Sequence, residues 1–272
     1  MRQAVLKKIR KYFVVWLINA KARLMERMAY PVNFFVMAMA VVLQMVLPVI
    51  LLNVIFRFSG DLSGWNRDQA MIVLATYMFI EGLSWATHAF VAGLKMNIMS
   101  GTFDSFLVKP IDAQFSASFS RADPEDWMRL VTAAIVFVKA TENLVFTWGQ
   151  LAVNAFLYLF LLVTAYLIVY SISLFVATLS IWFTEVRALF TITDNIIKMS
   201  RYPTDIYFPS AVRIIFSTIL PIAFISTIPA KIFLFGPRLD LIAYSFIVAI
   251  IFFVASRKFF HYGLKHYSSA SS

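Results

Sequence analysis

LKMNIMSGTFDSFLVKPIDAQFSASFSRADPEDWMR, residues 94–129, is a polar segment that separates two strongly apolar parts of the chain. It contains several acidic residues, two prolines, a glycine turn and short amphipathic pieces. Chains that only cross a membrane need short connectors, so a polar loop of this length indicates a segment that holds something against it. We call residues 94–129 the polar loop and expect it to be a docking surface for a cytoplasmic partner.

The composition on either side of the polar loop is that of a membrane protein. Of the 272 residues, 61% are hydrophobic and 14% are charged, and the mean hydropathy is +0.80. Soluble domains are about 45–50% apolar and about 25% charged. The long, unbroken apolar runs argue against a β-barrel, whose strands alternate in polarity. We therefore predict an all-α, polytopic integral membrane protein with a single domain, residues 1–272.

The residue types that are absent or rare restrict the chemistry. Cysteine is absent, which excludes disulfides, thiolate metal sites and cysteine nucleophiles. Of the three histidines, two lie in the C-terminal tail, so we expect no metal site within the membrane. The net charge of +10 does not require nucleic acid as a partner, because cytoplasmic segments of membrane proteins carry an excess of Lys and Arg.

Residues 1–28 combine eight Lys or Arg residues with an apolar stripe at helical spacing. The stripe consists of Leu6, Ile9, Phe13, Trp16, Ala20 and Leu24. This pattern predicts an amphipathic helix that lies in the lipid headgroups. A cleaved signal peptide does not fit, because basic residues continue to Arg27 and a run of full span length follows. The basic N-terminus and the basic tail both predict a cytoplasmic location.

The apolar runs predict six transmembrane helices. Five of them are expected at residues 31–56, 69–93, 127–148, 151–183 and 239–256. The fourth run corresponds to a helix of roughly 50 Å, longer than the hydrocarbon core of a bilayer. The second contains a stripe of small residues, among them Gly82, that lets another helix approach closely. Packing within the chain is the favoured interpretation of this stripe over a subunit interface.

The position of the remaining span has two interpretations. Residues 186–202 have a helical but polar pattern that includes Asp194, whereas residues 209–235 are apolar but interrupted by prolines. Hydropathy alone selects 209–235. In the alternative, the polar helix crosses the membrane among shielding neighbours, and 209–235 is a re-entrant pair near the outer face.

Glu81, His88 and Asp194 are candidate residues of a substrate pathway, because an ionisable residue inside a membrane is a functional candidate by default. Glu81 has three candidate roles: a proton relay, contact with a cationic substrate, or a structural contact with another helix, which is favoured. His88 lies seven residues later on the same helical face, and a packing role is favoured over a proton path. Asp194 and Lys198 are four residues apart, which fits an intrahelical pair or a lining of the dimer axis.

Four segments resemble the type-2 ABC transporter permeases, specifically the bacterial subfamily labelled "ABC-2 family transporter protein". They are GTFDSFLVKP at 101–110, IWF at 181–183, YPTDIYFPSAVR at 202–213 and ILPIAFISTIPA at 219–230. The resemblance implies a six-helix subunit that dimerises and works with separate ATPase subunits. It also implies an N-terminal interfacial helix, a coupling helix after the second span and re-entrant helices before the last, which favours the re-entrant interpretation of 209–235.

The resemblance also implies which residues couple the chain to an ATPase. Carried onto this sequence, they are Gly101, Asp104, Phe106, Lys109 and Pro110. The chain has no G-x-x-x-x-G-K-[ST] phosphate loop, so we expect no cofactor in it and expect ATP and Mg²⁺ on the partner ATPase. Lys139 and Glu142 make the third predicted span more polar than the resemblance leads us to expect.

These observations predict the permease subunit of an ATP-driven exporter in the bacterial cytoplasmic membrane, not an enzyme. The direction of transport is implied only by the resemblance, and a hydrophobic or amphipathic substrate by the apolar composition. The expected partners are an ABC ATPase, a second copy of the permease or a homologue, and membrane lipids. Two alternatives use Glu81 and His88: a membrane-embedded transferase and a proton-driven secondary transporter. The second of these leaves the polar loop unexplained.

Overall fold

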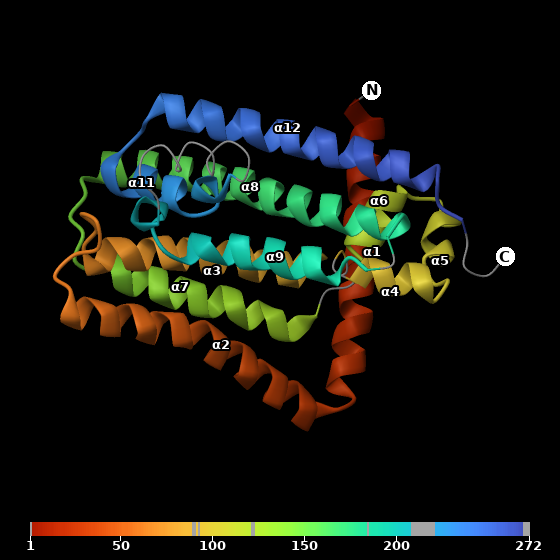
Figure 1. Ribbon diagram of the computed structural model, residues 1–272, viewed down its shortest axis with the longest axis horizontal. Coiled ribbons are helices and arrows are strands. Elements are labelled where there is room, and N and C mark those ends of the chain that lie inside the picture. Colours follow the sequence, from red (N-terminus) through yellow and green to blue (C-terminus); the bar gives the residue numbers. More distant parts are fainter. Residues whose placement is uncertain are drawn as a thin grey trace.

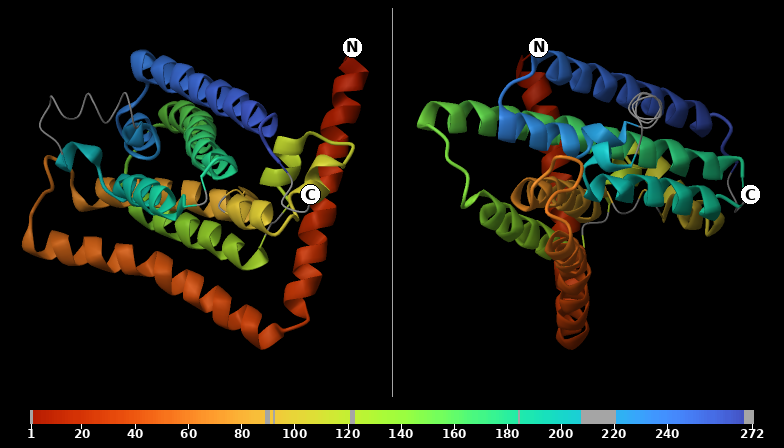
Figure 2. Two further views of the ribbon diagram at one scale, coloured as in Figure 1. Left: turned by 45° about the vertical axis from the view of Figure 1, so that its right-hand side comes forward. Right: turned by 60° about the vertical axis from the view of Figure 1, so that its left-hand side comes forward.

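A computed structural model of the chain describes residues 2–268 except for 89, 90, 92, 121, 122, 184 and 208–220. Within these ranges the structure consists of helices and connections and contains no strand, so the all-α prediction is confirmed. The long helices lie lengthwise beside one another, and α1 runs crosswise at one end of them (Figure 1). Both further views show the same crosswise placement (Figure 2).

Helix α1, Arg2–Met28, shows that the basic N-terminal segment is helical, as its sequence pattern predicts; its amphipathic, interfacial character stays a prediction. Its first turn contains no acidic residue, and its last turn contains Arg27. A basic residue at the C-terminal end of a helix interacts favourably with the helix dipole. A helix that crosses the ends of long apolar helices has the orientation expected of an interfacial helix.

Four helices are long and apolar enough to cross a membrane, judged by length and composition. They are α2 (Pro31–Phe58), α3 (Arg67–His88), α8 (Trp148–Thr178, continued to Ile181 by a 3-10 turn, η3) and α12 (Leu239–Leu264). They correspond to four of the six predicted spans. The unit formed by α8 and its turn has 34 residues, roughly 50 Å, so its predicted excess length is confirmed.

Helix α7, Trp127–Thr141, is shorter than the predicted third span. It begins after a 3-10 turn, η2 (Pro124–Asp126), which has proline at its first position. The predicted end at residue 148 was wrong, because a new helix begins there. Thr147 and Gln150 form a capping box that starts α8 at Trp148.

The segment before α12 consists of short elements. Helix α9 (Arg187–Lys198) continues into the 3-10 turn η4 (Met199–Arg201), and a further turn, η5, covers Thr204–Ile206. After residue 220 come the turn η6 (Ile222–Phe224) and α11 (Thr227–Phe235). With nine residues, about 14 Å, α11 is too short to cross a membrane alone. Residues 208–220 lie outside the described residues, so the re-entrant pair and the sixth span stay predictions.

The polar loop folds into short helices at the end of the bundle where α1 lies (Figure 1). They are α4 (Leu94–Met99), α5 (Asp104–Leu107), α6 (Ala113–Ser118) and η2. The C-terminal end of α12 lies at the same end (Figure 1). The described residues of the loop therefore form short helices between α3 on one side and α7 on the other.

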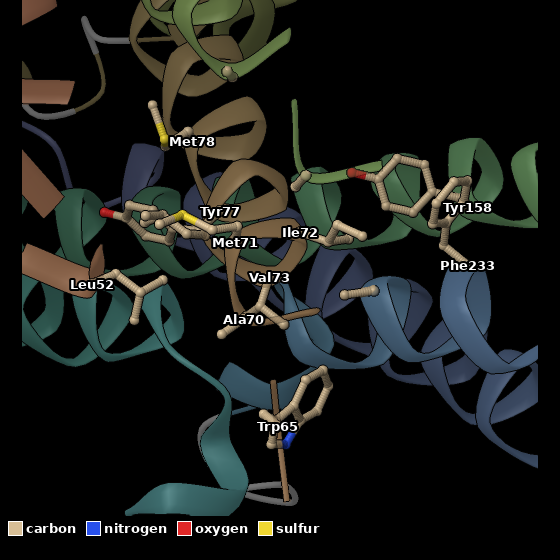
Figure 3. Packing of buried hydrophobic residues seen from close by; sticks show 14 of the residues in the cluster. Leu52, Trp65, Ala70, Met71, Ile72, Val73, Tyr77, Met78, Tyr158 and Phe233 are labelled. Atoms are coloured by element: carbon tan, nitrogen blue, oxygen red, sulfur yellow. The ribbon is translucent and has the colours of Figure 1, made fainter. Parts of the chain in front are cut away.

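The core is organised around α3, the most deeply buried of the four long helices. In Figure 3 its side chains lie among those of neighbouring elements, including Leu52 and Tyr158. The ring of Tyr158 packs against Phe233 of α11 with ring centroids 5.4 Å apart. At Gly82 the backbone of α7 comes so close that an added Cβ would lie 2.9 Å from the Cβ of Arg129. The small-residue stripe therefore serves packing within the chain at this position.

Candidate functional site

A cavity of about 590 Å³ lies between α3, α8 and α9. Its volume falls in the range of about 300–1,000 Å³ typical of small-molecule sites. Glu81, His88 and Asp194 all line it, although the first two come from α3 and the third from α9. The structure thus brings together the three residues that sequence reasoning placed on a substrate pathway. Met96 of α4 also lines the cavity, so the polar loop forms part of its wall.

Glu81 is held by a cation from another segment. Its side chain is 9% exposed, and Oε1 lies 3.7 Å from Nη2 of Arg201 in η4. This distance allows an ion pair but exceeds that of a hydrogen bond. The Arg201 guanidinium also lies over the ring of Tyr77, 5.3 Å from its centroid. Glu81 therefore makes a contact between segments through Oε1, of the kind that the structural interpretation of this residue predicts.

The second carboxylate oxygen of Glu81, Oε2, is buried and has no hydrogen-bond partner among the described residues. Ser84, one turn further along α3, lines the same cavity, and its Oγ is also buried without a partner. Such atoms are uncommon in folded proteins, because each lost hydrogen bond to water costs about 1–3 kcal/mol.

His88 is enclosed by hydroxyl groups and aromatic rings. Its Nδ1 lies 3.2 Å from the hydroxyl of Tyr166 and 3.3 Å from that of Thr87. Its ring contacts those of Tyr166 and Tyr170 edge to face, with centroids 5.3 and 5.2 Å apart. These are the contacts of a packed histidine, and they engage Nδ1.

Asp194 forms an ion pair with Lys198 one turn later on α9, and its side chain is half exposed. The pair is the one that the spacing of the two residues predicts. Across the part of the chain that the structure describes, no group of three or more His, Cys, Asp or Glu side chains is placed to hold a metal ion.

Two of the predicted coupling residues shape the start of α5. Gly101 has a φ of +70°, a left-handed conformation that favours glycine, and it turns the chain from α4 towards α5. Asp104 is in the first turn of α5 and accepts a hydrogen bond of 2.9 Å from the hydroxyl of Tyr267, beyond the end of α12. Burial and the Asp104 carboxylate raise the pKa of Tyr267 to about 12. This contact fixes α5 to the C-terminal segment.

The other three coupling residues lie at the exposed end of the polar loop. The Lys109 ammonium lies 4.6 Å from the centroid of the Phe106 ring. The carbonyl oxygen of Pro110 accepts a hydrogen bond of 2.7 Å from Nζ of Lys11 in α1. Val108, between Phe106 and Lys109, is 82% exposed, and the neighbouring Leu107 is also an exposed apolar side chain. The structure therefore places all five predicted coupling residues in one small region.

Helix α1 also contacts the second half of the polar loop. Arg27 lies 3.0 Å from Oε1 of Glu125 and 3.5 Å from Oδ1 of Asp123, and both acids are buried. The hydroxyl of Tyr12 accepts a hydrogen bond of 3.1 Å from the backbone N–H of Asp112. Helix α1 thus holds the loop at its middle and near its C-terminal end.

Asp112 connects the loop to α12. Its Oδ1 accepts a hydrogen bond from the N–H of Phe115 and caps α6, and its Oδ2 lies 2.9 Å from Nη2 of Arg257. Burial raises the pKa of Asp112, but the Phe115 N–H and the Arg257 guanidinium lower it more, so it lies below its ordinary value. Arg257 also donates a hydrogen bond to Gln114, 2.9 Å away.

The profile of a family described as "ABC-2 family transporter protein" matches residues 42–271. The chain belongs to the ABC-2 transporter family. No curated protein and no solved structure matches it. Family membership makes the chain a membrane-embedded transport subunit of an ABC transporter, a permease component that is not itself catalytic and that pairs with an ABC ATPase. The resemblance stated from the four sequence segments is thereby confirmed.

In this ABC-2 protein, Tyr170 of α8 joins the polar loop to the cavity. Its hydroxyl lies 2.9 Å from Nε2 of Gln114 and 2.8 Å from Oγ of Ser118, both in α6. Its ring stacks on Phe119 with centroids 5.8 Å apart and contacts His88, which lines the cavity. Contacts therefore run without a gap from α6 through Tyr170 to His88.

Sequence reasoning did not identify Tyr170, Arg201 or Arg257. Each is a polar or charged residue within or beside an apolar stretch, and the rule that drew attention to Glu81 applies to them too. The hydrogen-bond partners of Tyr170 and Arg257 lie 52 to 145 positions away in the chain, so only the fold shows what these residues bind.

Proposed function

We propose that this ABC-2 protein is the permease subunit of an exporter, that its polar loop docks onto a separate ATPase, and that its cavity lies on the substrate path. The observation that carries the proposal is the connection between the two sites. The exposed tip of the loop, α6, Tyr170 and the cavity wall form one set of contacting elements.

The docking surface comprises α5 and the residues after it. Gly101 sets the turn, Asp104 anchors α5 to Tyr267, and Phe106, Lys109 and Pro110 form the outer side. Val108 supplies an exposed apolar contact at its tip. A short helix that is fixed at its base and exposed at its tip fits a groove on a partner and moves with it.

Movement of the ATPase then reaches the cavity through Gln114 and Tyr170, which displace α8. Asp112 and Arg257 pass the same movement to α12, which does not line the cavity. Because α8 forms one wall of the cavity and Met96 of the loop lies in another, a displaced loop changes the shape of the cavity. ATP and Mg²⁺ bind on the partner, and this chain supplies the path.

The remaining features of the proposal follow from the family. Two permease subunits, either identical or homologous, form the pathway in the cytoplasmic membrane of a bacterium, with both termini in the cytoplasm. Each has six spans and a re-entrant segment at 209–235, and lipids surround it. Glu81, His88 and Asp194 face the substrate, and export of a hydrophobic or amphipathic compound is the direction that the family resemblance implies.

Co-purification from the native host tests the docking step. The Asp104→Ala chain, extracted in a mild detergent, should retain several-fold less ATPase than the wild type, because α5 loses its anchor on Tyr267. The matched control is Asp240→Ala, which removes an acid from the first turn of α12, where Asp240 pairs with Arg238. Equal ATPase recovery in both variants, with both chains folded, would refute docking at this surface.

A further inference from the structure

The cavity contains two polar atoms whose hydrogen bonds are not made within the chain. Oε2 of Glu81 and Oγ of Ser84 are both buried, and neither has a partner among the described residues. The two residues are three positions apart on α3, so their side chains lie on the same helical face, and both line the cavity.

The position of Arg201 determines which kind of ligand group can pair with Oε2 of Glu81. Its guanidinium approaches the Oε1 side of the carboxylate and does not line the cavity, so Glu81 lies between a cation and an open space. A buried carboxylate oxygen without a donor is costly. A ligand group that donates N–H hydrogen bonds from the cavity side supplies the missing partner of Oε2, whereas an anionic group is repelled by the negative charge of Glu81.

The rest of the wall favours an apolar body. Tyr77, Trp85 and Phe190 contribute aromatic rings, and aliphatic residues from α3, α8 and α9 cover most of the remaining surface. Arg187 lines the cavity as well, but its side chain is exposed, so water screens its charge. A mostly apolar cavity with a few convergent polar groups is typical of a site that orients an amphipathic ligand.

We propose that the cavity binds an amphipathic amine. The protonated nitrogen donates hydrogen bonds to Oε2 of Glu81 and Oγ of Ser84, and the apolar body packs against the aromatic rings of the wall. Asp194 also lines the cavity, but it is half exposed and paired with Lys198, so Glu81 is the acid that selects the amine. This inference rests on the proposed function, since it names the class of substrate that the permease carries.

The test compares a fluorescent amine with its neutral derivative. Dansylcadaverine carries a primary amine on an aliphatic chain, and its N-acetyl derivative keeps the apolar body but loses the charge. Both are titrated into the full-length chain in nanodiscs of zwitterionic lipid, and energy transfer from tryptophan to the dansyl group reports binding. Protein-free nanodiscs correct for partition into lipid. We expect the amine to bind at least about ten-fold more tightly, as expected for a charged hydrogen bond in a buried site.

Variants identify the atoms responsible. Glu81→Gln should reduce amine affinity to about that of the acetyl derivative and leave the acetyl derivative unchanged, because the amide keeps the size of the side chain but not its charge. Ser84→Ala should weaken amine binding by a smaller factor. Glu142→Gln, at an exposed acid paired with Lys139 outside the cavity, should change neither.

Equal affinity of the wild type for the amine and its acetyl derivative would overturn the proposal, as would a folded Glu81→Gln chain with unchanged amine binding. If Glu81→Gln does not fold, the wild-type comparison and Ser84→Ala decide. Co-purification of the ATPase separates this inference from the proposed function. An associated ATPase without amine selectivity overturns the substrate class alone, and amine selectivity without any ATPase overturns the permease function while the binding site stands.

Discussion

Replacing Tyr170 by phenylalanine removes a single oxygen from the connection between the polar loop and α8. The hydroxyl is bonded to Nε2 of Gln114 at 2.9 Å and to Oγ of Ser118 at 2.8 Å, and all three side chains are buried. Buried polar groups that lose their partner each cost about 1–3 kcal/mol. We therefore expect Tyr170→Phe to lower the free energy of local opening of α6 by about 2 kcal/mol, or roughly 30-fold in the opening equilibrium.

Hydrogen–deuterium exchange in lipid nanodiscs measures this opening directly. Peptides that cover residues 113–118 should exchange roughly 30-fold faster in Tyr170→Phe than in the wild type. Tyr158→Phe is the matched control, since Tyr158 lies on the same helix and is also buried, but its hydroxyl contacts Thr76 of α3, 2.9 Å away. Unchanged α6 exchange in Tyr170→Phe, or the same increase in Tyr158→Phe, would refute Tyr170 as the connection.

Three further predictions concern the polar loop and the packing of α3. Because the folded pKa of Asp112 is lowered, its pairing with Arg257 stabilises the chain at neutral pH and is lost as the pH falls below the ordinary aspartate value of about 3.9. Thermal unfolding of the wild type and Asp112→Asn should differ by less than about 1 kcal/mol at pH 7, because the pair is partly exposed, and converge in acid; a gap that widens in acid contradicts this. Gly82→Ala should destabilise the chain by about 1–3 kcal/mol in a thermal-shift assay, since its Cβ would lie 2.9 Å from that of Arg129, whereas Gly149→Ala, with open space around it in the first turn of α8, should be neutral or stabilising. A change in stability of the same sign in both variants would contradict the close packing at Gly82. Gly101→Ala should cost about 1 kcal/mol and weaken ATPase recovery in the co-purification assay, because φ is +70° there; recovery equal to the wild type would show that this turn does not shape the docking surface.

The helices could be predicted where the sequence carries its own signals. Pro31 marks the start of α2, Pro124 the start of the unit that leads into α7, and the apolar runs give the four long helices. The error at the end of α7 was avoidable. Thr147 and Gln150 have the spacing of a capping box, a local signal that α8 begins at Trp148.

The candidate site was predictable only in part, because its residues can be found in the sequence but their pairings depend on the tertiary structure. Glu81 and His88 stand out in the sequence as polar residues in an apolar span, and Asp194 as an acid in the polar helical segment 186–202. The fold places all three on one cavity. The pairing of Glu81 with Arg201 joins residues that are far apart in the chain, and no local pattern specifies it. The unpartnered Oε2 of Glu81 is likewise a property of tertiary structure alone.

Site-specific photo-crosslinking in the membranes of the native host tests most directly whether the polar loop docks onto an ATPase. A crosslinking amino acid at Val108, 82% exposed at the tip of the loop, is compared with one at Val145, 96% exposed in the connection between α7 and α8. That connection lies at the opposite end of the long helices (Figure 1). We predict that position 108 captures a soluble protein with a phosphate loop and that position 145 does not. Capture of no such protein at 108, or equal capture at both positions, would contradict the assignment.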